Sequence, residues 1–164
     1  MAIWYEVEHS EKGIRNFMDC NWHFHDFKIE RVNYLPDSYT AELFLKYDEL
    51  EGSVILRFVN VHSMNVNIQV NTGWINDIAG SILLLLKNGQ LLWIDDDQWE
   101  DQSIDHIEEL KKESSWVQAE RLIWAITDSN GNPTELPADK IDQIWDIYGK
   151  IEHHHFELTP LDEL

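Results

Sequence analysis

The feature that most constrains the fold is an alternation of apolar and polar side chains in the first half of the chain. Residues 39–47 alternate in this way, with Phe44 as the exception. Successive side chains of a β-strand point to opposite faces, so the pattern predicts a strand with one buried face. Several segments of this kind in succession are typical of an antiparallel sheet that covers a core.

Similar patterns predict further strands. We expect them over residues 3–7, 23–35, 54–58, 64–70, 82–86 and 91–94. In the second of these the apolar phase shifts between Ile29 and Val32, which predicts a β-bulge. Lys87-Asn88-Gly89-Gln90 lies between two continuous apolar runs and predicts a hairpin whose strands are covered on both faces.

Helical spacing of apolar residues predicts a helix near each end of the chain, over residues 10–20 and Ala138–Gly149. Ser10 is a suitable N-cap for the first, and Gly149 ends the second. Ser103–Lys112 is expected to be a helical turn or a loop. The sequence thus has helix-forming segments that flank the predicted strands.

Residues 116–127 fit either a helix or one face of a strand, and we favour the strand. The fold class expected for residues 1–164 is a single α+β domain, mostly antiparallel β-sheet with a helix near each end. The polar tail from about residue 150 is expected to be loosely held.

The charge balance narrows the classes of partner. The chain carries 31 acidic and 12 basic side chains, a net charge of −19, while 43% hydrophobic residues supply a core. This charge repels phosphate backbones and anionic lipids, so we expect no nucleic-acid and no membrane partner. A basic protein would be attracted, although solubility alone also explains the charge.

The acidic residues are concentrated in the second part of the chain. Residues 1–60 carry a net charge of −5 and residues 61–164 a net charge of −14. The densest stretch contains the residues that we expect to contact a partner, namely Asp95, Asp96, Asp97, Trp99, Glu100 and Asp101. Trp is enriched at the centres of protein interfaces, so Trp99 is the expected anchor. The alternatives are a solvated acidic loop and a Trp that packs beneath it.

Cys20, His23, His25 and Asp26 are of residue types that bind metals. On a strand, His23 and His25 would point to the same side and could share a metal ion, with Asp26 on the opposite face. The alternative is that these side chains form local hydrogen bonds. No glycine-rich phosphate-binding loop occurs in the sequence, and we expect no cofactor.

Three segments resemble a loose group of small uncharacterised bacterial proteins, some of which are similar to immunity proteins of polymorphic toxin systems. The segments are Trp22-His23-Phe24-His25-Asp26-Phe27-Lys28-Ile29, Ala41-Glu42-Leu43-Phe44-Leu45 and Val54-Ile55-Leu56-Arg57-Phe58. The group shares an aromatic-x-Phe-His-Asp-x-x-Ile opening and a run of antiparallel strands. The resemblance covers about residues 22–70 and implies a structural role for His25 and Asp26 at the start of a strand.

We therefore expect a non-enzymatic, cytoplasmic protein that binds a basic protein, of which an immunity protein is the most concrete version. The single cysteine, Cys20, and the absence of a visible signal peptide suit a cytoplasmic location. One alternative is a metal-dependent enzyme centred on His23, His25 and Asp26. The other is a structural or oligomer-forming module.

Overall fold

A computed structural model describes residues 3–48, 50–67, 77–78, 80–96, 107–135 and 159–161. Its strands are β1 (Tyr5–Glu6), β2 (Phe27–Leu35), β3 (Thr40–Lys46), β4 (Ser53–Asn65), β5 (Asp77–Ile78), β6 (Ser81–Leu85), β7 (Leu91–Asp95), β8 (Trp116–Thr127), β9 (Pro133–Thr134) and β10 (Thr159–Pro160). The helices are α1 (Glu11–Cys20) and α2 (Ile107–Glu113), with short 3-10 helices η1 (Trp22–Phe24) and η2 (Pro36–Ser38). All the strand pairs are antiparallel, which confirms the predicted α+β class.

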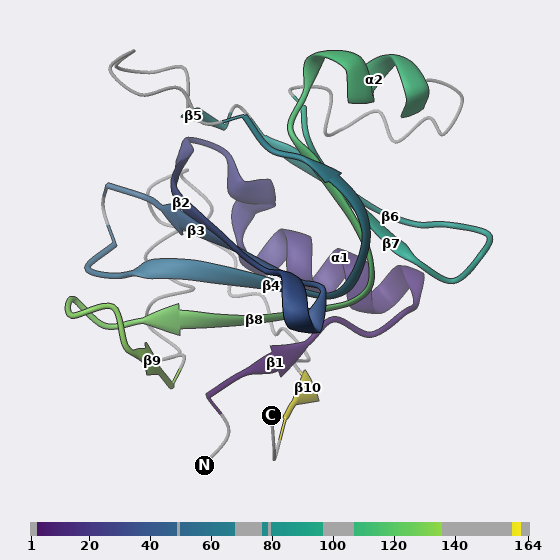
Figure 1. Cartoon of the computed structure of the whole chain (residues 1–164). Coiled ribbons are helices and arrows are strands. Elements are labelled where there is room, and N and C mark those ends of the chain that lie inside the picture. Colours follow the sequence, from purple (N-terminus) through teal and green to yellow (C-terminus); the bar gives the residue numbers. More distant parts are fainter. Residues whose placement is uncertain are drawn as a thin grey trace.

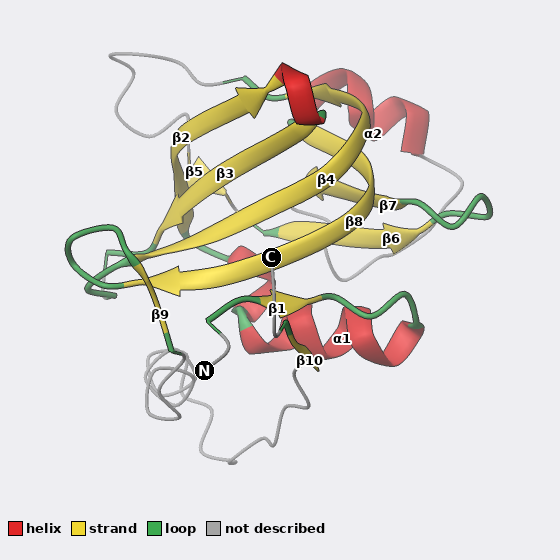
Figure 2. Cartoon of the chain, turned by 60° about the horizontal axis from the view of Figure 1, so that its bottom comes forward, coloured by secondary structure: helices red, strands yellow, loops and turns green. Residues whose placement is uncertain are grey.

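The sheet curls so that the strands at its two ends, β5 and β6, are consecutive in the chain. β2 pairs with β3, β3 with β4, β4 with β8, β8 with β7 and β7 with β6. β5, which comes just before β6 in the chain, pairs back with β2. We call these strands the strand ring, and Figure 2 shows them curving around the interior.

The interior of the strand ring holds the main core. Leu43, Leu56, Trp93 and Trp124, from four different strands, are almost completely buried there. The helix α1 lies beneath β6 in Figure 2 and adds Phe17, whose ring centroid lies 5.6 Å from that of Trp124. Burying apolar surface of this kind is the main stabilising term of the fold.

The helix α1 forms as the sequence predicts. The Ser10 hydroxyl accepts a hydrogen bond from the Gly13 amide at 3.0 Å, which satisfies one of the free N–H groups of the first turn. Ile14, Phe17 and Met18 lie on one face and are buried. This face supplies the contacts that hold α1 against the core.

The predicted hairpin and its two-sided burial are also confirmed. Gly89 adopts φ +86°, as the turn between β6 and β7 requires. Leu83 and Trp93 face the main core, while Ile82 and Leu92 lie in a second cluster. Part of α2 covers that second cluster, so both faces of the hairpin are buried.

Residues 116–127 form the strand β8, which confirms the favoured assignment. The bulge in β2 is confirmed as well, because the register with β3 shifts between Ile29 and Arg31. The prediction of a separate strand beginning at Met64 is wrong, since β4 runs without interruption from Ser53 to Asn65. The polar residues that break the pattern lie at a bulge between Val61 and Ser63, where the strand bends.

The two ends of the described chain lie side by side. β1 pairs with both β8 and β10, and Figure 1 shows β1 and β10 together at its lower edge. The Leu161 amide donates a hydrogen bond to the Trp4 carbonyl at 2.9 Å. Residues 159–161 of the predicted loose tail are therefore paired with the sheet. The helix predicted over residues 138–149 and the remainder of the tail lie outside the described residues.

Within the part of the chain that the structure describes, neither helix has the length and apolar character needed to cross a bilayer.

Replacing Gly52 with alanine should destabilise the protein by about 2–3 kcal/mol. A Cβ at Gly52 would overlap the backbone carbonyl of Thr127, so the β3–β4 turn and the end of β8 would have to separate. Urea unfolding followed by circular dichroism measures the loss. Gly131→Ala is the matched control: it has open space but a left-handed φ of +82°, and should cost about 1 kcal/mol. Equal losses in the two variants would contradict the packing argument.

Candidate functional site

The predicted acidic contact begins where β7 ends. Asp95 is the last residue of β7, and its amide donates to the Ser115 carbonyl at 2.8 Å. The Asp96 amide donates to the Gly80 carbonyl at 3.1 Å, and the Ser114 hydroxyl donates to the Asp96 carboxylate at 3.4 Å. Asp97, Trp99, Glu100 and Asp101 lie outside the described residues. The structure therefore places only the start of this stretch, beside the beginning of β8.

The predicted strand start at His23 is wrong, because β2 begins only at Phe27. His23 lies in η1, and His23, Phe24 and Asp26 all adopt left-handed φ values of 52°, 56° and 64°. These values are incompatible with an extended strand. The buried rings of Phe24 and Phe27, whose centroids are 5.2 Å apart, hold this tight corner against the core. The premise that placed the two histidines on one strand face therefore fails.

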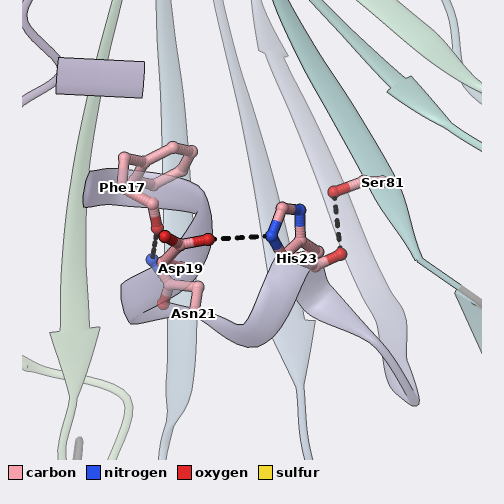
Figure 3. A network of polar contacts seen from close by, with 5 residues as sticks. All are labelled: Phe17, Asp19, Asn21, His23 and Ser81. Carbon is pink, nitrogen blue, oxygen red and sulfur yellow. Dashed lines mark hydrogen bonds and ion pairs between the residues drawn. The ribbon is translucent and has the colours of Figure 1, made fainter. Parts of the chain in front are cut away.

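The corner is fixed by a small polar network (Figure 3). The Nε2 atom of His23 lies 2.9 Å from Oδ1 of Asp19, across the last turn of α1. The His23 carbonyl accepts a hydrogen bond from the Ser81 hydroxyl at 3.2 Å, and the Asn21 side chain donates to the Phe17 carbonyl at 3.0 Å. These contacts tie α1, η1 and β6 together, which is a structural task.

The candidate metal ligands have separate partners. His25 pairs with its neighbour Asp26, with 3.1 Å between Nδ1 and Oδ2, while His23 pairs with Asp19. Among the described residues, no three side chains of His, Cys, Asp or Glu gather closely enough to hold a metal ion. The three residues named for a metal therefore lie in two separate histidine–carboxylate contacts at the turn between α1 and β2.

Cys20, the other reactive residue type nearby, is buried at the end of α1. Burial, and to a smaller extent the charge of Asp19, raises the pKa of the Cys20 thiol to about 12. The nucleophilic form of cysteine is the thiolate, which this environment suppresses at neutral pH. Cys20 therefore acts as a small apolar core residue.

A groove of about 610 Å³ runs between α1 and β6 beside this corner. Its apolar lining comes from Ile14, Met18 and Leu83, and its charged lining includes Arg15 and Asp19. Arg15 is engaged with Glu11 at 2.8 Å, and Asp19 with His23. The groove therefore presents apolar surface with a rim of charges that are already paired.

The turn between β2 and β3 carries an exposed apolar surface that was not predicted from the sequence. Tyr34, Leu35 and Tyr39 have exposed fractions of 47%, 48% and 62%. We call residues 34–39 the β2–β3 tip; its short helix η2 lies at the top of Figure 2. The sequence does carry a signal for this exposed surface, since two tyrosines and a leucine directly flank Pro36-Asp37-Ser38. Residues that flank a turn are often accessible.

At least five of the ten described Lys and Arg side chains pair with carboxylates of the same chain. Such pairs are Arg15–Glu11, Lys28–Asp48, Arg57–Glu42, Lys111–Glu108 and Arg121–Glu6, with distances from 2.6 to 3.9 Å. A further group of carboxylates is exposed, namely those of Glu8, Asp37, Glu51, Glu113 and Glu120. Because these five cations have acidic partners and the chain carries 31 acidic against 12 basic side chains, the surplus carboxylates dominate the field around the protein.

No protein-family model, curated protein or solved structure shows a significant match to the chain.

The Cys20 thiol should resist modification in the folded protein at about pH 8 and react fully once the protein is unfolded. Its pKa rises from 9.0 to about 12 on folding, so the unfolded chain releases the proton first. Stability should therefore fall as the pH rises above about 9. Urea titrations at increasing pH measure the free energy of unfolding of the wild type and of Cys20→Ala, and this free energy should fall less steeply with pH in the variant. Fast labelling of the native protein, or the same fall with pH in both proteins, would contradict the burial of Cys20.

Proposed function

We propose that the chain is a non-enzymatic, cytoplasmic binding protein whose acidic surface holds a basic partner protein. The observation that carries this proposal is the pattern of charge: at least five of the ten described Lys and Arg side chains pair with carboxylates of the same chain, while many other carboxylates face solvent. A net charge of −19 then acts on any cationic protein that approaches. Such a field accelerates encounter and favours basic partners over acidic ones.

The most concrete version of this function is an immunity protein that neutralises a cationic toxin in a bacterial cell. The resemblance over residues 22–70 supports it. In the fold, these residues contribute buried core side chains such as Phe24, Phe27 and Leu43, and Nδ1 of His25 lies 3.1 Å from the carboxylate of Asp26 at the corner. The motif is thereby suited to a scaffold, and recognition would fall to other, exposed residues.

The acidic stretch remains the proposed electrostatic contact. Residues 61–164 carry a net charge of −14, and Asp95, Asp96, Asp97, Glu100 and Asp101 lie in its densest part, with Trp99 as the proposed anchor. The rigid backbone contacts of Asp95 and Asp96 give this stretch a fixed starting point. A fixed start lowers the ordering cost of forming a contact there.

Binding of the basic partner should weaken steeply as salt is raised, because exposed charges are screened beyond about 8 Å at physiological ionic strength. The protein is immobilised, partners are captured from a bacterial lysate at low salt and identified by mass spectrometry, and the best candidate is purified. Surface plasmon resonance at increasing salt then gives the association rate. A strongly basic partner is expected, with a rate that falls about tenfold or more from low to physiological salt.

Two charge-matched variants separate local placement from net charge. Asp97→Asn/Glu100→Gln/Asp101→Asn should slow association several-fold more than Glu8→Gln/Glu51→Gln/Glu135→Gln, which removes equal charge from exposed positions elsewhere. Equal effects would show that only net charge matters. Recovery of no basic protein at low salt, or binding that is indifferent to salt, would overturn the proposed function.

A further inference from the structure

We infer that the β2–β3 tip, through Tyr34, Leu35 and Tyr39, is a second contact with the basic partner in addition to the acidic stretch, and that it fits an apolar group flanked by lysine or arginine. This inference rests on the proposed function, because it names the surface and the chemistry by which that partner would be held. It adds a contact that charge alone does not supply.

The exposure of the tip is the first argument. Among the described residues, the large apolar side chains with the greatest exposure are Tyr34, Leu35 and Tyr39, and these lie within six consecutive positions. The other exposed large apolar residue, Leu85, lies at the β6–β7 hairpin. Single exposed apolar residues are ordinary on protein surfaces, whereas a local concentration of them marks an interaction site. Tyrosine is also among the residues most enriched at the centres of interfaces.

The tip is also rigid, which suits recognition. The Tyr39 amide donates to the Pro36 carbonyl at 3.3 Å, and the Thr40 hydroxyl donates to the Ser38 carbonyl at 3.2 Å. The Val61 amide of β4 donates to the Tyr39 carbonyl at 2.8 Å, which ties the tip to the neighbouring strand. Because the backbone is already fixed, little further ordering is needed when a partner binds.

The conformation of Tyr39 gives a third argument. It has φ 49° and ψ 42°, the left-handed region that bulky residues seldom occupy and that glycine or asparagine adopts more readily. The side chain is 62% exposed, so core packing does not account for a tyrosine at this strained position. Strained residues of this kind are concentrated at functional sites, and a binding role for the ring supplies a reason for it.

Charge complementarity identifies the occupant. Asp37 lies between the two tyrosines in sequence and is exposed. The exposed Glu120 of β8 accepts a hydrogen bond from Asn60, next to the anchoring residue Val61. These two exposed carboxylates favour lysine or arginine in a partner, and both of those side chains also bind aromatic rings through cation–π contacts. A second copy of this chain, with net charge −19, would be repelled.

The test uses two short synthetic peptides with equal numbers of lysines, one spaced by glycine and serine and the other by leucine and tryptophan. Fluorescence anisotropy with the full chain gives the affinity for each peptide at low salt. The wild type is expected to bind the apolar peptide at least about tenfold more tightly. The variant Tyr34→Ser/Tyr39→Asn should reduce this preference to within about twofold, while the Leu85→Ser control retains it.

Thermal unfolding checks whether the tyrosine variant still folds. We expect it to fold, because asparagine tolerates the left-handed conformation at position 39 and the replaced rings are exposed. A variant that unfolds as the wild type does and loses the preference supports the inference. An unchanged preference in the tyrosine variant, or equal wild-type affinity for both peptides, overturns the inference and leaves the proposed function standing. If neither peptide binds at low salt, the proposed function fails, and the inference fails with it.

Discussion

The antiparallel pairing of β4 with β8 is the interaction on which the rest of the structure depends. These are the longest described strands, with 13 and 12 residues, and their inward-facing side chains, such as Phe58 and Trp124, are buried in the core. The outer edge of β8 pairs with β7 near its start and with β1 and β9 near its end. β4 carries β3 and then β2 on its other side. Losing this pair would divide the sheet into two parts, one carried by β4 and the other by β8.

The bend in this pair links the fold to the proposed contact surface. The register shift between Val61 and Ser63 turns β4 so that the strand ring can close. Immediately at that bend, the Val61 amide holds the Tyr39 carbonyl, and Asn60 with φ 54° reaches Glu120 of β8. The irregularity that closes the sheet therefore also fixes the exposed β2–β3 tip. A straight β4 would supply neither the curvature nor this anchor.

Local signals predicted much of this fold, while tertiary contacts decided the rest. Ser10, the Asn88-Gly89 turn and the phase shift after Ile29 act within a few residues, so the sequence reveals them directly. The left-handed φ of His23 arises from packing between Phe24, Phe27 and the core, and alternation alone suggested a strand there. Similarly, the exposure of the β2–β3 tip depends on which residues the other segments of the fold cover, so the sequence did not predict this surface.

The acidic charge and the exposed tip are best understood together. Long-range attraction governs how fast a partner arrives, whereas buried apolar contacts govern how long it stays. A rigid apolar tip such as Tyr34, Leu35 and Tyr39 would promote self-association on a protein of low net charge. At −19, copies of the chain repel one another, so the tip can stay exposed without self-association. Under the proposed function, solubility and recognition are compatible explanations of the charge, because the first makes the second possible.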